Sequence, residues 1–218
     1  MGNAVRSNTW HPSVDAVGGE SPDPWMSTTV CSDKTLKDHL EVQATGFRRI
    51  NFNTVVNQSK NHETTFAIRW SRGFCKGRHI FEISFPTSMR GNHASVGIAN
   101  KMAPTYLHKS AALVGETKDS WGIDLVTSRT VHNGKEISKY PKGDRHKLPD
   151  RFYMYIDIPE RKLLFGADGI FYGCAFSGMD IDGQTVYPML SATSPGATVT
   201  MVYRGKGVIV TGPIRKTR

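Results

Sequence analysis

Short apolar runs separated by turn-forming residues dominate the chain from Leu40 onward. The runs are about four to eight residues long, with Gly, Pro, Asn and Asp between them, a texture typical of antiparallel strands. The clearer strand candidates are 65–69, 79–85, 93–99, 120–125, 152–158, 162–165, 186–190 and 198–203. The pattern predicts an all-β chain.

Alternation inside two of these segments predicts that the strands form two stacked layers. In 79–85 one strand face is strongly apolar and the other mixed, the apolar face holding Phe81, Ile83 and Phe85. In 152–158 a face with two tyrosines opposes an oily face of Phe152, Met154 and Ile156. We therefore expect a two-sheet antiparallel β-sandwich with little helix, apart from one helical turn near 111–114.

Turn-forming residues support this strand count. Asn133-Gly134 and Asp168-Gly169 are dipeptides that accept a positive φ and close tight hairpins, and 159–161 supplies another reversal. Residues 1–35 are rich in Ser, Pro, Asp and Gly and predict an irregular N-terminal arm. We expect the sandwich domain over 36–205 and a basic C-terminal tail over 206–218.

Composition indicates a folded chain without a membrane anchor. The 218 residues suit one domain, and no apolar stretch is long enough for a spanning helix or a signal peptide. Arg6 stands where a myristoylation motif needs Ser or Thr. The three widely spaced cysteines indicate reduced thiols, so we expect a protein of the cytosol or nucleus. We also expect a monomer.

No motif for catalysis, metal binding or nucleotide binding emerges. The eight histidines and three cysteines lack zinc-ligand spacing, and 180–183 resembles only the opening of a calcium loop. The nucleophile elbow G-x-S-x-G is absent, and 115–120 lacks the glycines that cradle a phosphate. We expect no enzyme, no cofactor and no metal, with an unrecognised hydrolase as an alternative.

The formal charge of +9 leaves nucleic acid as the strongest rival partner. Aromatic and basic residues alternate in 69–74 and 151–153, where they could stack bases and neutralise phosphates. We favour the interpretation that Trp70 and Phe74 pack at a strand connection while the arginines face water. Nucleic acid is therefore the alternative and protein the expected partner.

Several segments, taken in order from Leu40 to Tyr203, resemble SPRY domains. The segments 77–83 (GRHIFEI), 120–125 (SWGIDL), 156–165 and 172–176 (YGCAF) are similar to the family's G-x-H-x-W-E-I, S-W-G-W-D-L, L-D…T-L-S-F and L-G-x-A-F motifs. Phe81 and Ile123 replace tryptophans of the pattern. Segments 90–99 and 111–115 resemble the SPRY-domain SOCS-box proteins, whereas 131–134, 187–192 and 199–203 resemble equally well the F-box/SPRY proteins.

The resemblance implies a role in protein ubiquitination. Members of both groups are substrate receptors of cullin-RING ubiquitin ligases, in which the SPRY domain binds a target peptide and a separate box recruits the ligase. Neither a SOCS box after Tyr203 nor the helical pattern of an F-box in 1–35 is visible. The resemblance therefore implies a target protein as partner, with ligase components reached through a part not seen here.

The residues that would hold the peptide depart from the SOCS-box pattern. The resemblance places the site at Asn53, Thr54, Val55, Arg90, Gly91, Asn92, Ser110, Thr193, Ser194 and Pro195. The family's arginine, tyrosine and tryptophan anchors fall on Asn53, Ser110 and Ser194. Because such side chains dominate binding energy, we expect a site in the same place with a different partner.

Overall fold

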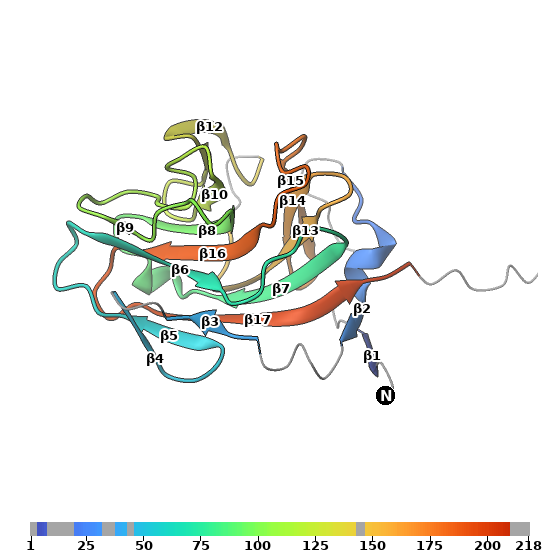
Figure 1. Ribbon diagram of the computed structural model, residues 1–218, viewed down its shortest axis with the longest axis horizontal. Coiled ribbons are helices and arrows are strands. Elements are labelled where there is room, and N and C mark those ends of the chain that lie inside the picture. The colour runs from blue at the N-terminus through green and yellow to red at the C-terminus, as the bar shows by residue number, and fades with distance from the viewer. Residues whose placement is uncertain (1–3, 8–19, 32–37, 43–45, 143–146, 210–218) are drawn as a thin grey trace, which may run out of the picture.

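The computed structural model of the chain describes residues 4–7 (backbone only), 20–31, 38–42, 46–142 and 147–209. Two antiparallel sheets lie face to face over these residues (Figure 1). Helix within them is limited to two short 3-10 segments, Pro24–Ser27 and Thr87–Met89. No helix in the described part of the chain is long and apolar enough to cross a membrane.

The first sheet has nine strands in the described residues. Its main path follows the order β1-β2-β17-β7-β13-β14-β15, and β5 pairs with both β17 and β4 beside this path. The strands are β1 (Ala4–Ser7), β2 (Thr28–Cys31), β4 (Phe47–Arg49), β5 (Thr54–Asn57), β7 (Arg78–Ser84), β13 (Arg151–Asp157), β14 (Lys162–Ala167), β15 (Ile170–Phe176) and β17 (Thr198–Gly207).

The second sheet has eight strands over the same described ranges. Its order is β12-β11-β10-β8-β16-β6-β3, and β9 pairs with β6 beside β3. The strands are β3 (Leu40–Glu41), β6 (Thr65–Trp70), β8 (Ala94–Ala99), β9 (Tyr106–Leu107), β10 (Ser120–Asp124), β11 (Arg129–His132), β12 (Lys135–Lys139) and β16 (Tyr187–Ala192). The prediction of a two-sheet antiparallel all-β fold is confirmed.

The main core lies between the two sheets and follows the predicted alternation. Phe81 and Ile83 of β7 point into it, as do Phe152, Met154 and Ile156 of β13. Trp70, Val96, Trp121, Ile123 and Leu190 of the second sheet face them. Burying these side chains removes a large apolar area from water, which stabilises the stacking of the sheets.

The outer face of the first sheet is also buried, beneath residues that we expected to be irregular. Trp25 and Met26 cover Ile80, Tyr153 and Tyr155, all nearly inaccessible to solvent. The Trp25 ring meets Tyr155 edge to face at 6.0 Å. Residues 28–31 then form β2, which pairs with the end of β17. The description of the whole N-terminal arm as irregular was therefore wrong for these residues, because a tryptophan-led segment shields a tyrosine-lined sheet face.

The eight predicted strand segments each coincide with a strand, and the three predicted reversals are confirmed. Asn133 and Gly134 both have positive φ in the β11–β12 hairpin, and Gly169 does so between β14 and β15. The helical turn expected near 111–114 is absent from these described residues. This apolar stretch instead lies over the outer face of the second sheet, where Leu113 and Val114 pack against Ala67 and Met189.

The limits of the sandwich stay predictions, but two observations bear on the expected tail. Lys206 and Gly207 belong to β17 rather than to a tail, and they pair with Val30 and Thr29. Residues 210–218, with Arg215, Lys216 and Arg218, lie outside the described residues.

Candidate functional site

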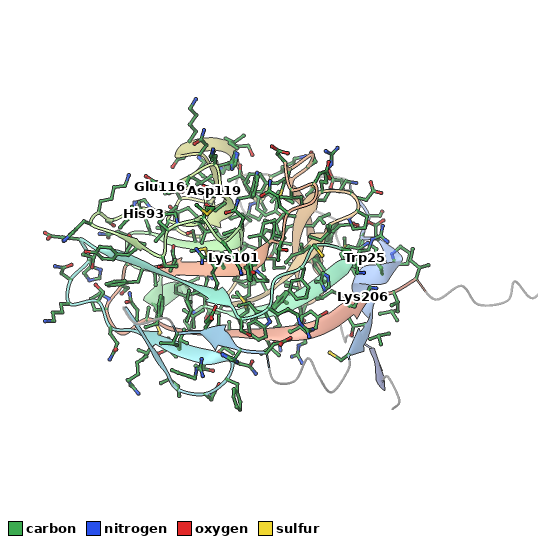
Figure 2. All side chains as sticks on the ribbon, viewed as in Figure 1. Trp25, His93, Lys101, Glu116, Asp119 and Lys206 are labelled. Atoms are coloured by element: carbon green, nitrogen blue, oxygen red, sulfur yellow. The ribbon has the colours of Figure 1, made fainter. Side chains whose placement is uncertain are left out.

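Four connections meet at one end of the sandwich, called the loop end here. They are residues 58–64 before β6, 85–93 before β8, 108–111 after β9, and 193–197 between β16 and β17. In Figure 1 they gather on the left, and Figure 2 labels His93 there. Strand register explains the meeting: Ala192 pairs with both Phe66 and Ala94, so the residues that follow β16 emerge beside those that precede β6 and β8.

Thr193 joins two of these connections. Its Oγ1 donates to the His93 carbonyl at 2.9 Å and accepts from the His93 amide at 3.2 Å. The side chain is fully buried. Thr193 is therefore a fixed support of the loop end and does not offer its hydroxyl to a partner.

Gly91 packs directly against the 193–197 turn. Its φ is +60°, and a Cβ added there would lie 2.9 Å from the Ser194 Cβ. A larger residue would therefore be strained and would push the two connections apart. Residues Asn92 and Pro195 on either side of this contact are exposed. The structure thus brings together Gly91, Asn92, Thr193, Ser194 and Pro195, as the resemblance implied.

Ser110 lies at the same end, next to the first residue of β6. The Thr65 hydroxyl donates to the Lys109 carbonyl at 2.7 Å and accepts from the Ala111 amide at 3.1 Å, which fixes Ser110 between them. The Ser110 hydroxyl oxygen is buried and has no hydrogen-bond partner in the described residues. Reaching a ligand would require a small movement of this segment.

Asn57 is a supporting residue that the sequence did not reveal. Its side-chain amide donates to the carbonyls of Ala192 (3.2 Å) and Ser194 (2.9 Å), while its oxygen accepts from the Ser59 amide. The Ser59 hydroxyl in turn meets the Thr64 hydroxyl at 3.1 Å. These bonds hold the 58–64 and 193–197 connections in one arrangement, which lowers the entropy cost of binding.

Arg90 has a structural role. Its side chain is 3% exposed and donates to the carbonyls of Phe85 (3.1 and 2.9 Å), Leu148 (2.8 Å) and Pro149 (2.6 Å). Burial lowers the pKa of the guanidinium, and nearby Asp150 opposes this shift. The guanidinium is therefore engaged with the chain itself and fixes the path of the 85–90 segment into the loop end.

Asn53, Thr54 and Val55 do not join the loop end. Val55 is a fully buried core residue of β5, and the Thr54 hydroxyl meets the Thr200 hydroxyl at 3.0 Å on β17. The Asn53 carbonyl accepts from the Met201 amide at 2.9 Å. Residues 53–55 thus lie beside β17, away from the loop end. Further along β5, Asn57 reaches the loop end through its hydrogen bond to the Ser194 carbonyl.

An aromatic row, also missed from the sequence, borders the loop end. The rings of Phe66 and Tyr106 lie 5.1 Å apart, and the His108 ring lies 5.5 Å from Tyr106. Tyr106 is 39% exposed and Phe66 is half-buried. An open hollow of about 450 Å³ adjoins this row, lined by Gly46, Gln58, Ser59, Lys60, Asn61, Thr64 and Phe66. Tyrosine and phenylalanine are common anchors of protein interfaces.

The described residues contain no group of three or more His, Cys, Asp or Glu side chains placed to hold a metal ion. His93 Nδ1 lies 2.6 Å from Asp124, but its ring makes no hydrogen bond to a Ser, Thr or Cys side chain of the described chain.

The aromatic residues considered for base stacking are buried, with Trp70 at 1%, Phe74 at 6% and Phe152 at 0% exposure. Arg69 differs from our expectation, because it is half-buried rather than facing water.

Comparison with known proteins identifies the fold family. The family model described as "SPRY domain" matches residues 78–206. The chain is 35% identical over 149 residues to SPRY domain-containing SOCS box protein 2 of Mus musculus, which covers 66% of this chain and 56% of the relative. It is 38% identical over 149 residues to Protein gustavus of Drosophila melanogaster, covering 66% of this chain and 53% of the relative.

A third relative, F-box/SPRY domain-containing protein 1 of Xenopus tropicalis, is 32% identical over 147 residues, which cover 66% of this chain and 51% of that protein. The chain thus spans about half the length of the curated relatives it matches. Among solved structures, the SPRY domain of human HERC1 has a TM-score of 0.55 at 19% identity, covering 78% of this chain and 96% of that one. The family match and the shared sandwich agree, and the chain belongs to the SPRY domain family.

Proposed function

We propose that this chain is a protein-recognition module that holds a linear peptide or a flat epitope at the loop end and catalyses no reaction. The observation that carries the proposal is the meeting of four connections that hydrogen bonds fix to one another, with exposed residues between them. Loops on a rigid sandwich can bind with little ordering cost. The contact surface comprises Asn92, Ser194, Pro195, Tyr106 and Phe66.

We further propose that the bound protein is a substrate of a cullin-RING ubiquitin ligase. Two of the relatives are named for a SOCS box or an F-box, and this similarity supports a receptor role for the loop end. We place the protein in the cytosol or nucleus, which the number and spacing of its cysteines support, and we propose that it is a monomer.

A peptide selection tests the recognition role. A displayed library of random peptides is selected on the wild-type chain, and the enriched peptides are measured against Tyr106→Ala, Asn92→Trp and Ser194→Trp. Ile137→Ala is the matched control, because Ile137 is also an exposed apolar residue (59%) but lies on β12, an edge strand of the second sheet. We expect the three loop-end variants to weaken binding by about tenfold or more and the control to leave it unchanged.

Two results would contradict the proposal. Selection of no peptide above background would count against peptide recognition, and equal binding by the loop-end variants would place the site elsewhere. Binding of random oligonucleotides that weakens steeply with salt, without peptide enrichment, would favour the nucleic-acid alternative. For the ligase role, the full-length protein should retain a cullin adaptor in a pull-down, and failure to do so would leave recognition without ubiquitination.

A further inference from the structure

Arg69 of β6 lies on the outer face of the second sheet, away from the main core, and lacks an ionic partner. Its Nη2 donates to the Ala103 carbonyl, whereas its Nε is buried without a hydrogen-bond partner among the described residues. No carboxylate in the described chain lies within ion-pair distance of it. Leaving a buried donor unpaired costs free energy, so the chain itself satisfies this guanidinium only in part.

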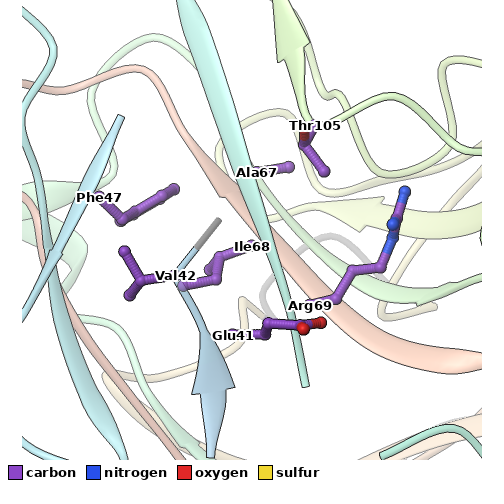
Figure 3. A pocket seen from close by; sticks show the side chains of 7 residues that line it. All are labelled: Glu41, Val42, Phe47, Ala67, Ile68, Arg69 and Thr105. Carbon is purple, nitrogen blue, oxygen red and sulfur yellow. The ribbon is translucent and has the colours of Figure 1, made fainter. Parts of the chain in front are cut away.

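Two adjoining hollows share Arg69 and its neighbour Glu41. The more polar one, of about 320 Å³, is lined by Glu41, Arg69, Ser71, Lys101 and Tyr187. The other is partly apolar, has only about 10 Å³ of free volume, and is drawn in Figure 3 with Val42, Phe47, Ala67, Ile68 and Thr105. Figure 3 shows the guanidinium of Arg69 turned away from the Glu41 carboxylate. The guanidinium therefore forms no close pair with Glu41, and it lines both hollows.

Lys101 and Tyr187 complete the polar hollow. Lys101 is exposed, is labelled in Figure 2, and forms no ion pair within the ranges that the structure describes. The Tyr187 ring packs closely against Gly73. A Cβ added to Gly73 would lie only 2.7 Å from the ring carbon Cζ. Burial lowers the pKa of Arg69, while Glu41 and Tyr187 oppose the shift. The hollow thus combines two cationic side chains and a positioned phenol with a single anionic group.

We propose that this polar hollow binds the carboxylate of an acidic side chain on a partner protein. Two cationic residues against one carboxylate leave a net charge of +1 on the lining, which matches a singly charged carboxylate better than a phosphate dianion. The partly apolar hollow beside it has room for about one water molecule and takes no side chain. Arg69 lies four residues along β6 from Thr65, about 13 Å from the loop end, so this site is separate from the proposed peptide site.

Nuclear magnetic resonance of the arginine side chains tests the proposal. The Nε–Hε resonance of Arg69 is followed during titration with N-acetyl-glutamate N-methylamide, and N-acetyl-glutamine N-methylamide at equal ionic strength is the neutral control. We expect a saturating shift with the glutamate compound alone. Lys101→Met should weaken binding about fivefold, and Lys135→Met, which removes an equally exposed lysine on β12, should leave it unchanged.

Glu41→Gln should change binding in the opposite direction from Lys101→Met. Removing the carboxylate that repels the ligand should strengthen binding severalfold, whereas a merely structural Glu41 would give no gain. The proposal is overturned if the Arg69 resonance does not respond, if the glutamine compound shifts it equally, or if Glu41→Gln weakens binding. Inorganic phosphate is titrated in parallel, and tighter binding of phosphate than of the glutamate compound would overturn the choice of a carboxylate ligand.

Discussion

Replacing Arg90 with methionine should destabilise the fold strongly while leaving the exposed surface of the loop end intact. Methionine fills a similar volume but cannot donate to the carbonyls of Phe85, Leu148 and Pro149, which Arg90 reaches with four hydrogen bonds. Hydrogen bonds to charged groups contribute about 1.5–3 kcal/mol each, and the desolvation of the guanidinium offsets part of this gain. We expect a net loss of about 3 kcal/mol, or a melting temperature lower by about 10 °C.

Urea unfolding followed by tryptophan fluorescence measures this loss, since Trp25, Trp70 and Trp121 are all buried. Arg129→Met is the matched control, because it removes the same charge from a side chain that is 45% exposed and lies 3.9 Å from Glu136. The control should change the free energy of unfolding by less than about 0.5 kcal/mol. If Arg90→Met were equally neutral, or lost partner binding at full stability, Arg90 would be a contact residue and our assignment would fail.

Three further predictions concern the fold. Gly97→Ala should prevent folding to the native state, because the new Cβ would lie 1.9 Å from the Trp121 carbonyl oxygen. Gly178→Ala is the control: its Cβ would have no neighbour within 4 Å, so it should lower the free energy of unfolding by only about 1 kcal/mol. Equal soluble yields of the two variants would refute the prediction. His79 is buried between the Tyr203 hydroxyl and the Lys76 carbonyl, and burial lowers its pKa to about 4. Below about pH 6.5 the unfolded chain binds a proton at His79 that the folded chain does not, so the free energy of unfolding falls by up to about 3 kcal/mol towards pH 4. The urea midpoint of His79→Gln should depend less on pH between about 6.5 and 4, and a pH dependence equal to that of the wild type would contradict the reasoning. Trp25→Ala should cost about 3 kcal/mol by uncovering Tyr155 and should speed hydrogen exchange in β2, whereas unchanged exchange would show that residues 24–31 do not stabilise the sheet.

Strands with one clearly apolar face could be predicted from the sequence, and those at edges could not. β7 and β13 alternate because each has one face in the main core. β12 is exposed at every position, so its sequence carries no apolar period and only the Asn133-Gly134 turn pointed to it. The segment 111–114 is apolar because it covers a sheet from outside, and an apolar run without a period does not distinguish such a cover from a helical turn.

The candidate site shows a similar division. Gly91 and Ser194 are about a hundred residues apart, and only the family resemblance brought them together before the structure did. The resemblance did not predict that Arg90 donates its hydrogen bonds to backbone carbonyls or that Val55 is buried in the core, because hydrogen bonding and burial depend on the whole fold. Tyr106 carried no motif, and its pairing with Phe66 appears only when β9 is seen to add to β6.

The long strand β17 connects two distant poles of the molecule. It begins beside the 193–197 turn and ends ten residues later paired with β2, a span of about 30 Å. Polypeptide joined before β1 or after β17 would therefore leave the sandwich at the pole opposite the loop end (Figure 1). An enzyme recruited through either extension would start on the side of the sandwich opposite the bound protein. The length and stiffness of the linker would then decide which lysines of the bound protein it can reach.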